Sequence, residues 1–432
     1  MIVIDDATKK IESNSLFEIK EDTAKDATVA AAAQKIIDRI DKEYGAVFAK
    51  SEVVLNGAKA PNGNRDSETN NGDLITDAMV WKILQDKESL TVDADHVVAV
   101  TNGGGIRKAI NPGDVTKKNI NEVLPFGNTV VTIYITGAEL LEALEASTYC
   151  TPDAIGGFPQ VSGINYTIST AVAYDANAET YPASTYYGPK SINRVTINSI
   201  NGKEFKADDT YAVITNDFCG GGGDTYYAFA AATAKFDTGI PLDEVVMEYI
   251  TAELKGVIGK QYAAPQGRIL MNPFADVKAS SWFGKYVIDL YNDGIINGTS
   301  ATTYAPNNPL TWAAALKLLL VSNGDLKAAD ATGADWSKNA IAKAAELGLV
   351  AADLDGAKAI SRLEFCQVAA KLNKLAESKT ESKFTDCTDG YVMALVDAKV
   401  ISGMTETTFE PAASLTRAQI AKILYQLTLI EK

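Results

Sequence analysis

The apolar positions of the first 270 residues change their spacing several times along the chain. Residues 25–45 carry apolar side chains three and four positions apart and end at a glycine, which predicts an amphipathic helix. The runs "DHVVAVTN" and "TYAVITN" are continuously apolar, as expected of strands buried on both faces. The segments "LITDAMVWKILQ" and "TGAELLEALEAST" have helical spacing, whereas "GINYTIST" and "INRVTINSINGKEF" are typical of antiparallel strands, the second with a turn at Asn201-Gly202. The pattern predicts a mixed α and β domain.

After residue 272 the pattern changes to helix-rich units that repeat. The tripeptide Phe274-Ala275-Asp276 recurs as Phe384-Thr385-Asp386. Four further pairs keep one common offset: Gly298 with Gly403, Tyr304 with Phe409, Pro306 with Pro411, and Thr311 with Thr416. A weaker middle unit, "AIAKAAELGLV" followed by "ISRLEF", has a shortened loop. Units of this size bury little surface alone, so they are expected to pack on one another.

These repeats resemble the S-layer homology (SLH) domain, whose pattern is F-x-D, an apolar helix, G-I/V-I-x-G, F-x-P and T-R-A-E. The resemblance implies an all-α module of three SLH repeats, at 272–325, 326–380 (degenerate) and 381–432, which binds a secondary cell-wall polymer of a bacterial envelope. The arginine of T-R-A-E is Arg362 in the second repeat and Arg417 in the third, and both are expected to contact the polymer. The first repeat has a tryptophan there and lacks this contact.

The bulk composition excludes several classes of protein. The 432 residues are 46% apolar and 22% charged, a globular balance, and the net charge of −15 argues against DNA or RNA as a partner. There is no apolar run long enough for membrane insertion, and the N-terminus lacks the apolar stretch of a signal peptide. The four cysteines form no C-x-x-C pair, which argues against a zinc ribbon. The single histidine, His96, is interpreted as a strand-end residue without a catalytic role.

Two apolar runs end in Thr-Asn followed by glycines: "VVAVTNGGGIR" (97–107) and "YAVITNDFCGGGGD" (211–224). Glycine lets the backbone approach a ligand closely, although tight turns alone would explain both runs equally well. Neither run matches a dinucleotide or P-loop fingerprint. Arg65 and Arg107 lie beside such turns, and only seven of the 40 basic residues are arginine. A guanidinium fork suits a phosphate or carboxylate, and surface ion pairs are the alternative.

The segments "RDSETNNGDLITDAM", "NGGGIR", "LPFGNTVVTIYITGAELLEALE", "FPQVSGINYTI" and "TNDFCGGGGD" occur in one order. In that order they resemble the C-terminal domain of 5′-nucleotidases, of the UDP-sugar hydrolase and 2′,3′-cyclic nucleotide phosphodiesterase group. The resemblance implies an α+β substrate-binding domain at 51–270. It also implies three groups of ligand contacts: Arg65 (in an R-x-x-E element with Glu68), Asn102 and Arg107 for phosphate; Phe126 and Phe218 on the two faces of the base; Asp224 for the ribose hydroxyls. Cys219, inside the glycine loop, is interpreted as a small packing residue, with a reactive thiol as the alternative.

Catalysis in this family uses two divalent metal ions held by a separate N-terminal domain, whose histidine-rich motifs do not occur here. Residues 25–45 resemble the helix that links the two domains, so 1–50 is expected to be the linker remnant of that missing metallophosphatase domain. The chain is therefore expected to hold no catalytic residue, metal or cofactor, and to be the C-terminal part of a longer exported protein with its signal peptide in the missing N-terminus. As a split protein or a fragment, it is expected to be inactive alone.

The expected function is the nucleotide-binding part of a 5′-nucleotidase-like phosphohydrolase, anchored outside the cell at the wall and acting in extracellular nucleotide catabolism. Nucleoside phosphates and a wall polymer are the expected partners, with 5′-monophosphates, cyclic phosphates and UDP-sugars all candidates. Two non-enzyme alternatives are a wall-anchored structural or adhesive protein and a nucleotide-scavenging module that works with a separate phosphatase.

Overall fold

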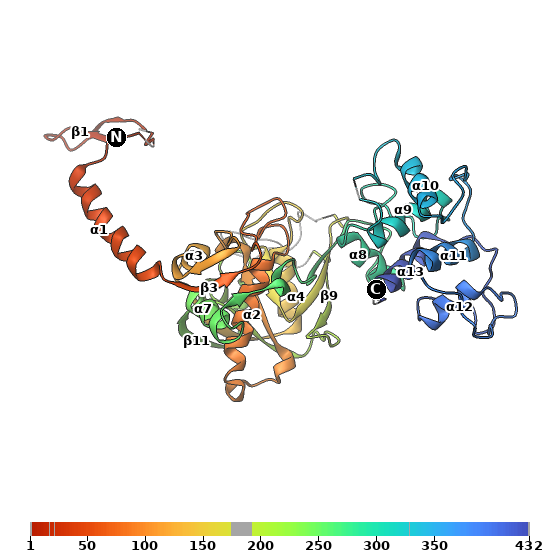
Figure 1. Cartoon of the computed structure of the whole chain (residues 1–432). Helices are drawn as coiled ribbons and strands as arrows, with labels where there is room; N and C mark the ends of the chain where they lie inside the picture. Colours follow the sequence, from red (N-terminus) through yellow and green to blue (C-terminus); the bar gives the residue numbers. More distant parts are fainter. Residues whose placement is uncertain (1, 17, 21, 174–191, 328, 431–432) are drawn as a thin grey trace.

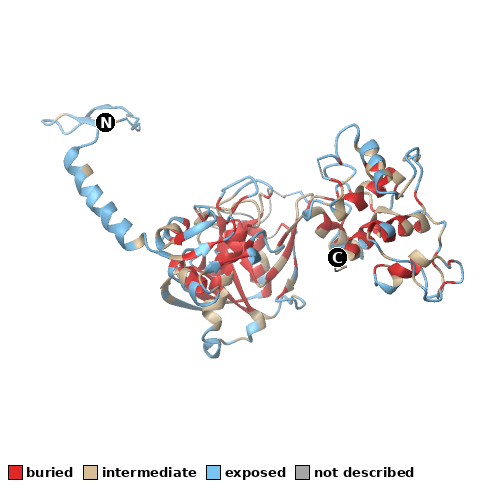
Figure 2. Ribbon diagram, in the orientation of Figure 1, coloured by how far each residue is buried: buried red, intermediate tan, exposed pale blue. Residues whose placement is uncertain are grey.

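A computed structural model describes residues 2–16, 18–20, 22–173, 192–327 and 329–430. An N-terminal hairpin and helix, an α/β body and a helical C-terminal part follow one another along the chain (Figure 1). The hairpin pairs β1 (Ile2–Ile4) with β2 (Ile11–Asn14), and α1 spans Ala27–Tyr44. Asp26 caps α1 and Gly45 ends it, which confirms the helix expected at 25–45. None of its residues is buried, so α1 projects into solvent (Figure 2).

A five-stranded mixed sheet forms the centre of the body, in the order β11-β6-β10-β4-β7. The strands are β4 (Val97–Asn102), β6 (Thr129–Thr136), β7 (Pro159–Ser162), β10 (Thr210–Asn216) and β11 (Ala234–Pro241). β10 runs parallel to β4 and antiparallel to β6. β4 and nearly all of β10 are buried, which confirms the two continuously apolar runs as strands covered on both faces.

Helices cover the two faces of this sheet. Alternate residues of β4 face opposite sides, so Val97 and Ala99 pack with α2 (Asn70–Leu84) and α7 (Leu242–Ala252). Val98 and Val100 pack on the other side with α4 (Gly137–Ser147). α3 (Lys117–Val123), α5 (Asp217–Gly220) and α6 (Tyr227–Ala230) are shorter helices around the body. The resulting layers are the mixed α/β arrangement that the sequence predicts.

Two three-stranded sheets complete the body. One has the order β12-β3-β5, from Val257–Ile258, Val47–Ser51 and Gly113–Thr116. The other has the order β13-β8-β9, from Ile269–Asn272, Ile164–Ser169 and Val195–Ile200. Asn201 and Gly202 both have positive φ, as the predicted turn requires. β8 and β9 pair antiparallel, as predicted.

The C-terminal part is helical and has its own hydrophobic core. Its helices are α8 (Gly284–Asn292), α9 (Trp312–Asn323), α10 (Trp336–Glu346), α11 (Arg362–Leu372), α12 (Gly390–Asp397) and α13 (Arg417–Thr428). β13 of the body leads directly into this helical part. The side chain of Asn292, in α8, accepts a hydrogen bond from the backbone N–H of Met271 in β13 and donates one to its carbonyl.

The three predicted repeats close into a ring through short backbone bridges. These bridges pair Pro309 with Thr416, Thr311 with Ala359, and Ser361 with Ser414. Helices α9, α11 and α13 begin at these bridges, with Thr311, Ser361 and Thr416 as N-caps. The first N–H of each helix donates to the loop of the next repeat, from Trp312 to Lys358, from Arg362 to Ala413 and from Arg417 to Asn308. Closure of the ring therefore requires all three units, including the middle one.

Candidate functional site

Four strand ends meet at one edge of the central sheet. β4 and β10 are parallel neighbours, so the segments after Asn102 and Asn216 leave the sheet at the same edge. β6 and β7 run antiparallel to them and begin there, with Val130 opposite Asn216 and Pro159 opposite Asn102. Loops at the carboxyl ends of parallel strands are common ligand sites in α/β proteins. The topology thus brings together chain segments that are more than a hundred residues apart.

A cavity of about 530 Å³ lies among these strand ends. It is lined by Arg65, Asn102, Gly104, Gly105, Arg107, Phe126, Asn128, Gly156, Phe218 and Asp224. All six ligand-binding residues expected from the sequence are in this set. Asn128 and Gly156 were not predicted, although each lies within or next to one of the recognised segments. The volume is in the range of sites that hold small ligands.

The glycine-rich loop places an aromatic ring and a carboxylate on the same cavity. Gly223 lies against the ring of Phe218, where a Cβ would come within 2.6 Å of the ring atoms. Asp224 follows with φ of +52°, a left-handed conformation that aspartate tolerates better than most residues. The loop is therefore a tight, ordered turn that aims Phe218 and Asp224 at one space.

Hydrogen bonds hold the polar floor of the cavity. Asn102 Nδ2 donates to Asp224 Oδ2 at 2.7 Å, and Asn216 Nδ2 donates to Asn102 Oδ1 at 3.1 Å. Asn216 Oδ1 in turn accepts the N–H of Cys219 at 2.8 Å, which caps α5. Burial raises the pKa of Asp224, while the bond from Asn102 and the charge of Arg65 act in the opposite direction. The carboxylate is oriented, with its second oxygen available to a ligand hydroxyl.

A side-chain hydrogen bond holds the Arg107 guanidinium, and a backbone hydrogen bond holds the segment that carries Arg65. Arg107 donates from Nη1 to the carbonyl of Gly104 at 3.1 Å, and its guanidinium lies 5.6 Å from the centre of the Phe126 ring. The backbone carbonyl of Arg65 accepts the N–H of Ile155 at 2.9 Å, which ties it to the loop before β7. Two cations, two phenyl rings and one carboxylate therefore surround one cavity.

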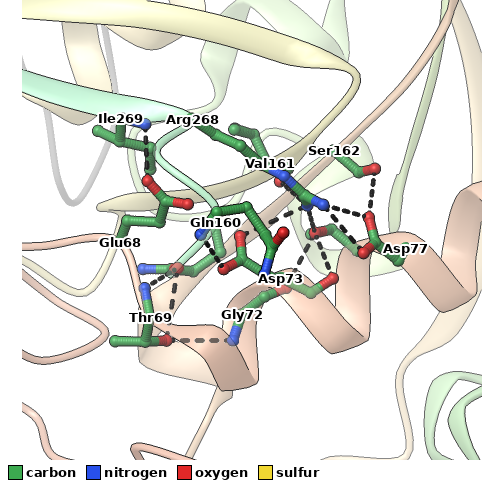
Figure 3. A network of polar contacts seen from close by, with 12 residues as sticks. Glu68, Thr69, Gly72, Asp73, Asp77, Gln160, Val161, Ser162, Arg268 and Ile269 are labelled. Atoms are coloured by element: carbon green, nitrogen blue, oxygen red, sulfur yellow. Dashed lines mark hydrogen bonds and ion pairs between the residues drawn. The ribbon is translucent and has the colours of Figure 1, made fainter. Parts of the chain in front are cut away.

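Glu68 of the R-x-x-E element does not line this cavity. Its Oε2 accepts the N–H of Ile269, at the start of β13, at 2.8 Å. Figure 3 shows it in a buried polar network with Asp73, Asp77 and Arg268, which joins the first turns of α2 to the strands behind it. The glutamate therefore anchors the helix that follows Arg65.

Asp73 is the carboxylate of this network whose charged form is most destabilised by burial. It is fully buried, and its Oδ1 accepts no hydrogen bond, although Arg268 Nη1 lies 3.4 Å away as an ion-pair partner. Burial and the nearby charge of Glu68 raise the pKa of Asp73 to about 8, against the opposing charge of Arg268. Burial also raises the pKa of Glu68. The folded protein therefore binds a proton at this cluster more tightly than the unfolded chain does.

The stabilising effect of that proton is expected to be complete below the unfolded pKa of about 4 and to be lost as pH rises through about 8. Asp73→Asn removes the titrating group, so it should flatten the fall of the unfolding free energy between pH 5 and pH 9. The change in this fall should exceed about 1.4 kcal/mol, the equivalent of one pKa unit. Denaturant unfolding at both pH values measures it, with the exposed Asp208→Asn as control. An equal fall in both variants would contradict the assignment.

Arg362 and Arg417, the predicted polymer contacts, make equivalent contacts across the repeats. The Arg417 guanidinium lies 4.4 Å from the centre of the Tyr304 ring, and donates to the carbonyls of Tyr304 and Asn297 at 2.6 and 2.7 Å. Arg362 lies 4.6 Å from the centre of the Phe409 ring and donates to the carbonyl of Ser402 at 2.7 Å. Each arginine thus clasps the loop of the next repeat in the ring.

The two arginines differ in how fully they are bonded. Arg362 is only 7% exposed, and its Nε is buried without a hydrogen-bond partner. It lines a cavity of about 160 Å³ together with Trp282, Gln419 and Lys422 from other repeats. Arg417 uses its Nε on a backbone carbonyl. Two cationic side chains, Arg362 and Lys422, therefore line this hollow, and the Nε of Arg362 makes no hydrogen bond.

His96 and Cys219 have structural surroundings. His96 ends a short turn before β4, stacks on Tyr211 and contacts Asp95 and Asp209 at 2.6 and 3.3 Å. The Asp95 contact raises its pKa. Cys219 is fully buried, and burial raises its thiol pKa. Neither residue is among those lining the strand-end cavity.

Fold and cavity together define a two-part protein, in which an α/β body with a strand-end cavity precedes a ring of helical repeats. Residues 47–231 match the family model of the 5′-nucleotidase C-terminal domain, and residues 273–315 and 386–421 match that of the S-layer homology domain. The chain therefore contains a 5′-nucleotidase C-terminal domain followed by S-layer homology domains, as the sequence motifs predict. The middle repeat lies outside the matched ranges, although its bridges place it in the ring.

Curated relatives carry names of phosphoesterases. The chain is 33% identical over 257 residues to the trifunctional nucleotide phosphoesterase protein YfkN of Bacillus subtilis (strain 168), covering 59% of this chain and 16% of that protein. It is 30% identical over 249 residues to 5′-nucleotidase of Mus musculus, covering 56% of this chain and 40% of the relative. The chain thus spans less than half the length of these two proteins.

Among solved structures, a 5′-nucleotidase precursor from Thermus thermophilus aligns with a TM-score of 0.45 at 29% identity, covering 63% of this chain and 48% of the other.

The described parts of the chain contain no group of three or more His, Cys, Asp and Glu side chains placed to hold a metal ion. Among the same residues, no helix is both long and apolar enough to cross a membrane.

Proposed function

We propose that the α/β body binds nucleoside phosphates and serves as the substrate-specificity part of a 5′-nucleotidase-like phosphohydrolase. The observation that carries the proposal is the convergence of Arg65, Arg107, Phe126, Phe218 and Asp224 on one cavity. Phosphate, a planar base and a ribose diol are the three groups that such side chains bind. Guanidinium forks pair with phosphate oxygens, phenyl rings stack on bases, and a carboxylate accepts hydrogen bonds from two neighbouring hydroxyls.

This convergence favours a ligand-binding part over a purely structural or adhesive protein. Phe126 and Phe218 are 61% and 46% exposed, so neither ring is explained by packing in the hydrophobic core. Aromatic rings that stay exposed beside two arginines are typical of a binding site, where a ligand stacks on the rings. Members of the matched family that are named for nucleotide chemistry support the same class of ligand.

Calorimetric titration of the chain with AMP, UMP and adenosine tests this proposal. Binding of both monophosphates is expected with or without Mn²⁺, because the cavity offers arginines to the phosphate. Phe218→Ala should weaken AMP binding about 5- to 150-fold, since stacking is worth roughly 1–3 kcal/mol per base. Phe236→Ala is the matched control, because this exposed ring on β11 does not line the cavity. No binding of any ligand at millimolar concentration would refute the proposal.

We further propose that the SLH repeats hold the protein at the outer surface of a bacterial cell wall by binding an anionic wall polymer. The support is the hollow at Arg362, which is lined by Arg362, Lys422 and Trp282, a residue that is 59% exposed. A cation paired with an aromatic surface suits a charged saccharide. In this proposal the enzyme or scavenging module acts on extracellular nucleotides.

A further inference from the structure

The two phenyl rings of the strand-end cavity come from different segments. Phe126 precedes β6, and Phe218 lies in the four-residue helix α5 after β10. Neither residue is buried in the hydrophobic core, since Phe126 is 61% exposed and Phe218 is 46% exposed. Local contacts with Gly223 and Arg107 hold each ring within its own surroundings, so the separation of the two rings also depends on contacts between their two segments.

One hydrogen bond joins the two segments beside the rings. Asn128 Nδ2 donates to Asp217 Oδ1 at 2.6 Å. Asn128 is two residues after Phe126, Asp217 directly precedes Phe218, and Asn128 itself lines the cavity. The bond therefore lies at the point where a change in spacing would move one ring relative to the other.

Both partners of this bond are anchored to the body. The carbonyl of Asn128 accepts the N–H of Leu242, at the start of α7, at 2.8 Å. The carbonyl of Asp217 accepts the N–H of Gly221 at 2.9 Å, within the turn that α5 forms. Between Phe126 and Asn128, Gly127 has φ of +66°, a conformation that glycine adopts freely. Backbone pairing of Val130 with Asn216 already brings the two segments together, and the side-chain bond extends this link to the residues next to the rings.

We propose that the Asn128–Asp217 pair sets the gap between Phe126 and Phe218, and so makes the cavity selective for ligands that carry a planar base. The inference rests on the proposed nucleotide binding and adds two positioning residues to it. The pair selects between ligands because a sugar phosphate uses the arginines and Asp224 and gains nothing from the spacing of the rings. A nucleotide uses both sets of contacts.

Titration of the full chain with AMP and with ribose 5-phosphate separates these contributions. Asn128→Ala and Asp217→Ala should each weaken AMP binding about five- to tenfold, a part of the loss expected when a stacking ring is removed. Ribose 5-phosphate affinity should change by less than about twofold in both variants. Asn121→Ala is the matched control, because it removes another asparagine–aspartate contact, to Asp243 at 3.4 Å, outside the cavity lining.

Exchange of the two partners provides the rescue. Asn128→Asp alone places two carboxylates face to face and should weaken AMP binding most. Adding Asp217→Asn restores one amide and one carboxylate, and should return AMP affinity to within about threefold of the unaltered chain. The double alanine variant should be no weaker than either single variant, because both remove the same bond.

Equal losses for AMP and ribose 5-phosphate, or additive losses in the double alanine variant, would overturn the inference while leaving nucleotide binding in place. Absence of AMP binding by the unaltered chain would overturn the proposed function and this inference together.

Discussion

Replacing Arg65 and Arg107 together with alanine is expected to weaken AMP binding by about two to four orders of magnitude. A hydrogen bond to a charged group contributes roughly 1.5–3 kcal/mol, and the variant removes the contacts of two guanidinium groups, about 3–6 kcal/mol in all. Both side chains line the cavity, and the phosphate of AMP is the group that they would share. Adenosine affinity should change little, because adenosine has no phosphate. Calorimetry with the two ligands measures the difference.

Lys108→Ala is the control for this loss. It removes a positive charge next to Arg107, but the side chain is exposed and does not line the cavity. Arg107→Lys tests the shape of the group, since lysine keeps the charge and lacks the fork, and it should recover only part of the affinity. If AMP and adenosine lost affinity equally, the arginines would be supporting the fold of the cavity and not the phosphate.

Arg417→Ala is expected to destabilise the helical repeats by about 2–5 kcal/mol. It removes two charge-assisted hydrogen bonds to the carbonyls of Tyr304 and Asn297 and a cation–π contact, at the interface that closes the ring from the third repeat to the first. Arg362→Ala removes one such hydrogen bond, so its loss of stability should be smaller. Thermal unfolding of the full chain measures both, with Arg39→Ala on the exposed helix α1 as control.

Polymer binding should rank the two arginines in the opposite order. Cosedimentation with cell-wall sacculi, with and without their secondary polymer, should fall more for Arg362→Ala at a temperature where both variants are folded. The reason is that Arg362 lines the hollow, whereas Arg417 is not among its lining residues. An Arg417→Ala variant with unchanged stability and abolished sedimentation would show that this arginine contacts the polymer and does not hold the ring together.

The T-R-A-E element shows why repeat motifs can be recognised before their role is known. Its first residue is an N-cap, and its fourth closes a capping box in the second and third repeats, through Glu364 and Gln419. These are local requirements of a helix start, so they are visible in the sequence. The contact of the arginine with the next repeat is a long-range feature, and only the closed ring shows it.

By itself the sequence determined the two-part organisation, the helix at 25–45, the buried strands around 97–102 and 210–216, and the types of side chain offered to a ligand. Each of these depends on local periodicity, turn chemistry or short ordered motifs. The central partner strand β6 was not predicted as a strand, because "TVVTIYIT" lies in a segment recognised by its motif and not by its period.

The tertiary structure decided which of these residues meet. Parallel pairing of β4 with β10 allows the side chains of Asn102 and Asp224 to meet at 2.7 Å although they are 122 residues apart. Antiparallel pairing of β6 with β10 and of β7 with β4 adds Asn128 and Gly156 to the cavity. The hydrogen bond from Ile269 in β13 turns Glu68 away from the cavity that Arg65 lines and places it in the buried carboxylate cluster. No local pattern contains strand order or ring closure, because both depend on the pairing of distant segments, and that pairing is what builds the site.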